Sequence, residues 1–152
     1  MTFNIKRIAF LALALYFGLI TSCGNTKELS ESTEWSLSLK KGGCMDVCDS
    51  YEILIQSSGE FDYKGIHGVK VMGQKTGELS KAKLKEIEVL VGSIDWYNLD
   101  SEYGSSGNGT QRKELIYTTG EKRVTVLYHR LEPQEIRKLE QLIDQIINGD
   151  EL

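Results

Sequence analysis

The spacing of apolar residues changes along this chain, and that change constrains its fold more than any other feature. From Glu34 onwards apolar and polar residues alternate, which is typical of a strand with one buried face. Residues 79–92 and 133–149 instead place apolar residues three and four positions apart, which is the spacing of an amphipathic helix. The pattern therefore predicts strands and two helices packed around one core.

Alternation marks six segments as strands, and turn residues separate them. Ser57, Ser58 and Gly59 favour a tight turn between two strands, which makes residues 51–64 a hairpin. The predicted strands are residues 34–40, a hairpin over 51–64, a weaker strand at Val69 and Val71, and two strands at 115–117 and 124–128 joined around Gly120.

The two helices are bounded by residues that start and stop helices. Ser80 is a suitable N-cap for the first helix, and Gly92 a suitable end. Pro133 fits the first turn of the second helix, which we expect to end near Gly149. Together these elements follow the order ββββαββα in a single domain over residues 34–149. We predict an α+β fold: a mainly antiparallel sheet with both helices packed on one face.

The N-terminus is typical of a secretory signal peptide. Lys6 and Arg7 precede the apolar run from residue 8 to residue 20, and no acidic residue accompanies them. Thirteen residues of helix reach roughly 20 Å, which is short of a hydrocarbon core about 30 Å thick. We therefore predict that residues 1–22 are a signal peptide and that a transmembrane helix is the weaker interpretation.

The residues after that run, LITSC, resemble a bacterial lipobox and make Cys23 the predicted lipidation site. Several acyl chains, palmitate among them, would attach the protein to a membrane durably. The alternative is an ordinary signal peptide cleaved near a cysteine. Gly24 stands where an Asp would resemble an inner-membrane retention signal, so we expect the outer membrane, on either face. Residues 23–33 are polar and are expected to form a flexible tether.

Charge and motifs exclude several functions. Removal of residues 1–22, which hold Lys6 and Arg7 and no acid, would change the formal net charge from −4 to −6. Such an acidic domain is unsuited to nucleic acid, whose phosphates require a basic surface. Neither a GxSxG elbow nor a GxxxxGK[ST] phosphate loop occurs. We predict no catalytic residue, cofactor or metal ion, and the glycine-rich residues 104–110 are expected to be a surface loop.

Cys44 and Cys48 are the two cysteines that lipidation would leave. In an oxidising compartment such a pair favours a structural disulfide. Four residues of extended strand span about 13 Å, whereas a disulfide needs Cα atoms roughly 4.4–6.8 Å apart. If the two are bonded, residues 44–48 must form a tight turn.

Two other roles for this pair remain open. A redox-active dithiol is disfavoured by the CxxxC spacing and by the lack of a surrounding βαβ pattern. A zinc site would need His67 and His129, or the carboxylates Asp46 and Asp49, at no standard spacing.

The segment GGCMDVCDSYEI, the hairpin IQSSGEFDYKG, the helix start LSKAKLKEI and the closing TTGEKRVTVLYHRLEPQEIRKLEQLID together resemble the DUF6438 family. These are bacterial domains of unknown function that are frequent on lipoproteins. Cys44, Cys48 and Tyr51 match the cysteine motif of that family, whereas Met45, Asp46 and Asp49 replace its Phe, Gly and Pro. The resemblance supports the fold and the pairing of the cysteines and implies no mechanism.

The sequence thus favours a membrane-anchored, non-catalytic binding or interaction module of the cell envelope, with the membrane as one partner through Cys23 and an envelope protein as another. The alternative function is a periplasmic thiol-redox protein that uses Cys44 and Cys48. A structural bridge should have a reduction potential below about −300 mV, which separates the two hypotheses.

Overall fold

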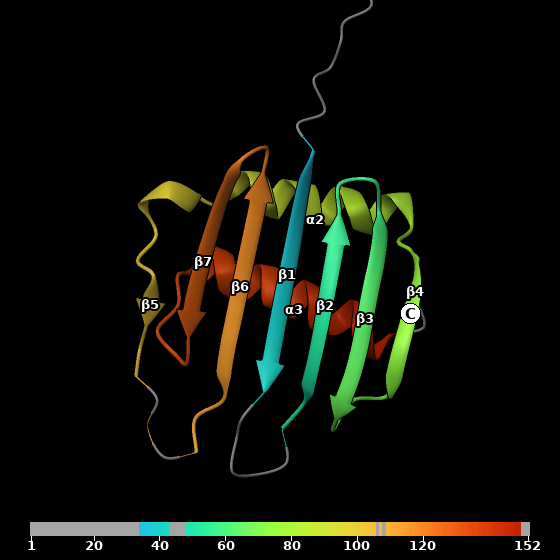
Figure 1. Cartoon of the computed structure of the whole chain (residues 1–152), viewed down its shortest axis with the longest axis horizontal. Helices are drawn as coiled ribbons and strands as arrows, with labels where there is room; N and C mark the ends of the chain where they lie inside the picture. The colour runs from blue at the N-terminus through green and yellow to red at the C-terminus, as the bar shows by residue number, and fades with distance from the viewer. Residues whose placement is uncertain (1–33, 43–47, 106, 108, 150–152) are drawn as a thin grey trace, which may run out of the picture. The chain divides into compact units, whose positions relative to one another are not determined.

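A seven-stranded sheet carries this fold (Figure 1). The computed structural model describes residues 34–42, 48–105, 107 and 109–149; the predicted signal peptide and tether lie outside them. In sheet order the strands are β4 (Gly73–Glu78), β3 (Glu60–His67), β2 (Ser50–Gln56), β1 (Trp35–Gly42), β6 (Arg112–Thr119), β7 (Lys122–Tyr128) and β5 (Glu102–Tyr103).

The first strand joins two hairpins into one sheet. β1 pairs with β2 on one side and with β6 on the other, both antiparallel. The β2–β3 and β6–β7 pairs are the hairpins that the turn residues predicted. Every described pairing is antiparallel except that of β5 with β7, which is parallel. The sheet is therefore mainly antiparallel, as predicted.

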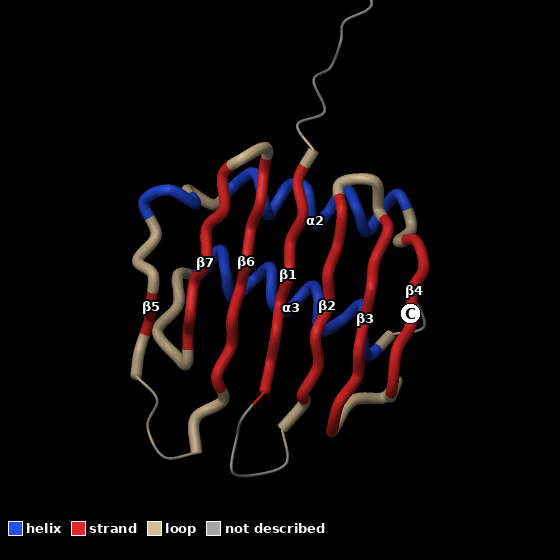
Figure 2. Tube along the Cα trace, viewed as in Figure 1, coloured by secondary structure: helices blue, strands red, loops and turns tan. Residues whose placement is uncertain are grey.

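Both helices cover the same face of the sheet (Figure 2). They are α2 (Lys81–Ser93) and α3 (Gln134–Asn148), and the short 3-10 turn η2 (Trp96–Asn98) follows α2. The α+β class, the chain order of the elements and the single helical layer are confirmed. None of the helices in the described part of the chain is long and apolar enough to cross a membrane.

The core lies between the sheet and the two helices. On β1, β2 and β3 every second residue is buried, for example Leu37, Leu39, Ile53 and Ile55 at 0–1% exposure. α3 closes this core with its apolar stripe, whose members are all buried: Ile136, Leu139, Leu142, Ile143, Ile146 and Ile147.

The prediction of the fourth strand was wrong in position. Val69 and Val71 lie in the connection after β3, and the strand itself is β4, whose six residues are all exposed. The connection folds back over Gly65, and the Tyr63 hydroxyl donates a hydrogen bond of 2.9 Å to the Val71 carbonyl. An edge strand without a buried face has no alternation to detect, because alternation records burial.

Smaller differences concern element ends. Ser80 caps α2 as predicted, and its hydroxyl accepts a hydrogen bond from the Lys83 amide. The helix continues past Gly92 and its C-cap is Ile94. Pro133 is the residue just before α3. β5 was not predicted, because two residues are too few for a period to show.

Candidate ligand-binding site

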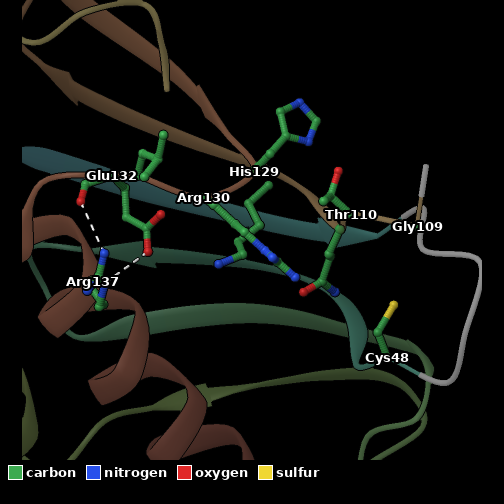
Figure 3. A pocket seen from close by; sticks show the side chains of 10 residues that line it. Cys48, Gly109, Thr110, His129, Arg130, Glu132 and Arg137 are labelled. Atoms are coloured by element: carbon green, nitrogen blue, oxygen red, sulfur yellow. Dashed lines mark hydrogen bonds and ion pairs between the residues drawn. The ribbon is translucent and has the colours of Figure 1, made fainter. Parts of the chain in front are cut away.

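A pocket lies where β7 passes into α3 (Figure 3). Its volume is about 570 Å³, within the range of small-molecule sites. It is lined by Cys48, residues 109–111, Lys113, residues 129–132 and Arg137. Four separate segments thus converge on one hollow.

Cys48 is held at the edge of this pocket by its neighbours. The Gln111 side-chain amide donates a hydrogen bond of 2.6 Å to the carbonyl of Asp49. Gly68 lies against the Cys48 carbonyl so closely that a Cβ there would be 2.9 Å from the oxygen. Gly68 also has φ +72°, a conformation that glycine adopts without strain. Both contacts fix where the cysteine segment enters β2.

Residues 129–132 form the wall opposite, and their backbone is unusual. Leu131 has φ 69°, and among the described residues other than glycine it alone has a positive φ. Its side chain is 78% exposed. The His129 amide donates to the Tyr103 carbonyl of β5 at 3.0 Å. Gly104 lies against the backbone of Arg130, where a Cβ would be 2.7 Å from the carbonyl oxygen. The short strand β5 therefore supports this wall.

Glu132 is the acidic residue among the described residues that line the pocket. Its side chain is 7% exposed, and its Oε1 atom accepts a hydrogen bond of 3.1 Å from Arg137 Nε. The other oxygen, Oε2, is buried and has no hydrogen-bond partner among the described residues. In Figure 3 the carboxylate turns one oxygen to Arg137 and the other away from it. A buried carboxylate oxygen without a donor is costly, so this atom is suited to a donor from a ligand.

Arg130 supplies a cation to the same pocket. It is exposed, and no acidic residue of the described chain forms an ion pair with it. Figure 3 shows its side chain extending towards the side of the pocket where Thr110 and Cys48 lie. Glu132 and Arg130 therefore offer an acceptor and a cation to one ligand.

His129 also lines the pocket, yet its ring is turned away from the Glu132–Arg137 pair (Figure 3). The residue is 7% exposed, and Nε2 lies 4.0 Å from Glu102 Oε1. Nδ1 is buried without a partner among the described residues. His67 lies at the end of β3, and no described group of three metal-binding side chains includes either histidine.

Below the pocket, four charged residues form a largely buried network between the sheet and α3, in which the Asp144 side chain is the most exposed at 29%. Lys41 Nζ lies 2.8 Å from Asp144 Oδ2 and 2.9 Å from Glu140 Oε1. Lys113 Nζ lies 2.9 Å from Glu140 Oε2. Two cations thus face two anions, which compensates the charges where water is largely excluded. Lys113 belongs to both the network and the pocket wall.

Two tyrosines complete this network. The Tyr51 hydroxyl donates a hydrogen bond of 2.7 Å to Asp144 Oδ1, and Tyr51 and Tyr128 are fully buried. Burial raises the pKa of both phenols, and the nearby carboxylates raise it further. The Lys113 ammonium lies 4.9 Å from the centre of the Tyr128 ring. Both phenols stay protonated. Tyr51 donates to Asp144, whereas the Tyr128 hydroxyl is buried without a hydrogen-bond partner among the described residues.

The network also shifts its own charged groups. Burial would lower the pKa of Lys41, but Asp144 and Glu140 outweigh burial and raise that pKa above its usual value. Burial would raise the pKa of Glu140, but Lys41 and Lys113 outweigh it and hold that pKa below its usual value. Both groups are therefore charged over a wide pH range.

The sequence identified some of these positions and missed others. Of the three cysteines, Cys48 lines the pocket, whereas Cys23 and Cys44 lie outside the described residues. Arg130, Glu132 and Arg137 were not predicted. The available clue was the charged stretch between the last strand and Pro133, which carries no apolar period.

The structure defines a small α+β domain with one helical layer and a polar pocket at the junction of β7 and α3. The family model for the domain of unknown function DUF6438 matches residues 36–147, from the start of β1 almost to the end of α3. The chain belongs to this family. No curated protein matches it significantly.

Proposed function

We propose that this protein is a lipid-anchored, non-catalytic binding module of the bacterial cell envelope, and that the pocket beside Cys48 is its ligand site. The observation that carries the proposal is the buried Glu132 carboxylate, which lines a hollow large enough for a small molecule and has one oxygen without a hydrogen-bond partner among the described residues. Arg130 adds a cation to the same hollow. A preformed hollow with a small number of well-placed polar groups is typical of a binding site.

Copurification tests the binding function. The full-length protein, isolated from its own envelope and sprayed under native conditions, should carry a small-molecule adduct in the mass spectrum. Thr110→Trp places an indole at the pocket wall and should remove the adduct, while Thr125→Trp on the far side of β7 should retain it. Absence of any adduct, or an adduct that Thr110→Trp leaves in place, would contradict the proposal.

The anchor is a separate part of the proposal. It rests on the lipobox-like LITSC and on the preceding apolar run. Mass spectrometry of the N-terminal peptide should find acyl chains on Cys23, and Cys23→Ser should release the protein from the outer-membrane fraction. An unmodified Cys23 would refute the anchor.

A disulfide between Cys44 and Cys48 is the third part, and we propose that it shapes the rim of the pocket. Support comes from Cys48, which is not a free thiol, and from the hydrogen bond that holds Asp49 next to it. The competing redox function is favoured by one observation, that Cys48 lines the pocket. A reduction potential below about −300 mV supports a structural bridge, and one near −200 mV would favour the redox function.

An envelope protein partner remains part of this proposal. A pull-down from detergent-solubilised envelope with the lipidated protein, compared with the Thr110→Trp variant, should recover the same partner in both if the protein contact lies outside the pocket.

A further inference from the structure

We propose that the pocket binds a small hydroxylated organic anion, a sugar acid or sugar phosphate, with its anionic group on Arg130 and a neighbouring hydroxyl on Glu132. This inference rests on the proposed binding function and adds the class of ligand.

The charge balance of the wall favours an anion. Lys113 is neutralised by Glu140, and Arg137 is neutralised by Glu132. Arg130 has no such partner in the described chain, so one positive charge of the lining is uncompensated. On a chain with net charge −4, a cationic hollow is a local exception that attracts anions. The planar guanidinium binds a carboxylate or a phosphate through two parallel hydrogen bonds.

The unused oxygen of Glu132 requires a donor on the same ligand. An ammonium group could donate, but the uncompensated guanidinium of Arg130 in the same hollow would repel it. A hydroxyl donates without carrying charge, so it fits better than an amine. The second group on the ligand is therefore a hydroxyl close to the anion.

Further acceptors lie along the wall. Gln111 uses its amide nitrogen on the Asp49 carbonyl, which leaves its side-chain oxygen for a ligand. The Thr110 hydroxyl donates to the Gly107 carbonyl at 2.9 Å, which leaves its lone pairs as acceptors. Several acceptors around one cation suit a ligand with several hydroxyls. A volume of about 570 Å³ accommodates a sugar of one or two rings.

Five probes test this on the full-length protein by calorimetric titration: glucose, glucuronate, glucose 6-phosphate, acetate and inorganic phosphate. Glucuronate or glucose 6-phosphate should bind about tenfold more tightly than glucose and than the matching simple anion. The tighter of the two identifies the anionic group as carboxylate or phosphate. Equal affinity for glucose and both of its anionic derivatives would overturn the inference.

Two variants assign the contacts. Arg130→Gln should weaken the anionic sugars about tenfold and leave glucose unchanged. Arg123→Gln, on β7 and outside the pocket, is the matched control and should bind like the unmodified protein. Glu132→Gln should weaken glucose, with circular dichroism as the check on folding, and should weaken the anionic sugars less, because Arg137 then loses its counter-charge. Arg130→Gln that binds the anionic sugars normally would overturn the inference.

The failure of this inference is distinguishable from failure of the binding function. If none of the five probes binds and the envelope-purified protein still carries an adduct, the ligand class is wrong and the binding function stands. If no adduct is found either, both are wrong.

Discussion

Leu131 has a positive φ and lies between Arg130 and Glu132, the two residues that we assign to ligand contact. A leucine in this conformation is strained by about 1 kcal/mol or more, and such strain is concentrated at functional positions. Its side chain is mostly exposed, so packing does not explain its identity. The turn at Leu131 sets the directions in which Arg130 and Glu132 leave the backbone.

Substitution at Leu131 should separate backbone strain from side-chain packing. Leu131→Gly should leave the free energy of unfolding within about 0.5 kcal/mol, because relief of strain offsets the greater freedom of glycine in the unfolded chain. Leu131→Ile should lower it by about 1 kcal/mol, since a β-branched residue tolerates positive φ poorly. Urea denaturation measures both. Equal stability of the Ile and Gly variants would argue against strain at this position.

Two adjacent lysines on β1 provide a matched test of the buried network. Lys41→Met leaves Glu140 and Asp144 without one of their cations and should lower the free energy of unfolding by about 3 kcal/mol. Lys40→Met lies on the open face of the sheet and should change it by less than about 0.5 kcal/mol. Chemical denaturation of both variants gives the comparison. Similar losses for the two would show that the network contributes little.

For single residues, the sequence predicts burial but not which residues come into contact. The alternation that buries Leu37 and Leu39 also places Lys41 on the buried face. A lysine there is expected to pair with a carboxylate, because an unpaired buried charge is costly. Its partners on α3 could not be identified, because Glu140 and Asp144 are about a hundred positions away in the chain. The pocket that Arg130 and Glu132 line could not be predicted for the same reason, because its segments are brought together only by the fold.

The two helices contribute unequally to the fold. α3 buries seven residues, including Glu140, whereas α2 buries Ile87 and Val91. The broad apolar stripe of α3 was visible in the sequence, and its position over the core was predicted correctly. The long-range arrangement that places α3 beneath the pocket was not, since neither the order of strands in the sheet nor β5 follows from periodicity.

Truncation of one residue on each helix tests this difference. Ile143→Ala removes a fully buried side chain of α3 and should lower the free energy of unfolding by about 3 kcal/mol. Val89→Ala on α2, where the side chain is 61% exposed, should cost less than about 0.5 kcal/mol. Thermal or urea unfolding measures both. A large loss for Val89→Ala would mean that another surface covers α2.

For the whole molecule, one face of the sheet is packed and the other is polar. Lys64, Glu52, Lys40 and Glu114 stand side by side across four strands of the open face, with alternating charge. Opposite charges on neighbouring strands stabilise a sheet modestly and keep its open face soluble. This arrangement explains why the sequence alternates so regularly, and it made the strands predictable.

The buried network should make global stability depend on acid. The pKa of Glu140 lies below its usual value of 4.5, so its contribution is complete above about pH 4.5 and is lost as the pH falls through the lowered value. Glu140→Gln removes this dependence. Unfolding free energies measured from pH 7 to pH 3 should therefore converge for the two proteins at low pH. Parallel curves would contradict the assignment.

The central claim is that the hollow between β7 and α3 binds a hydroxylated organic anion. Amide chemical shifts of the ¹⁵N-labelled full-length protein, recorded while glucuronate and then glucose 6-phosphate are added, test it most directly. We predict that the changes are concentrated at residues 109–113 and 129–132 and at Arg137, and that they saturate. Changes confined to the open face of the sheet, or no change with either ligand, would contradict this claim.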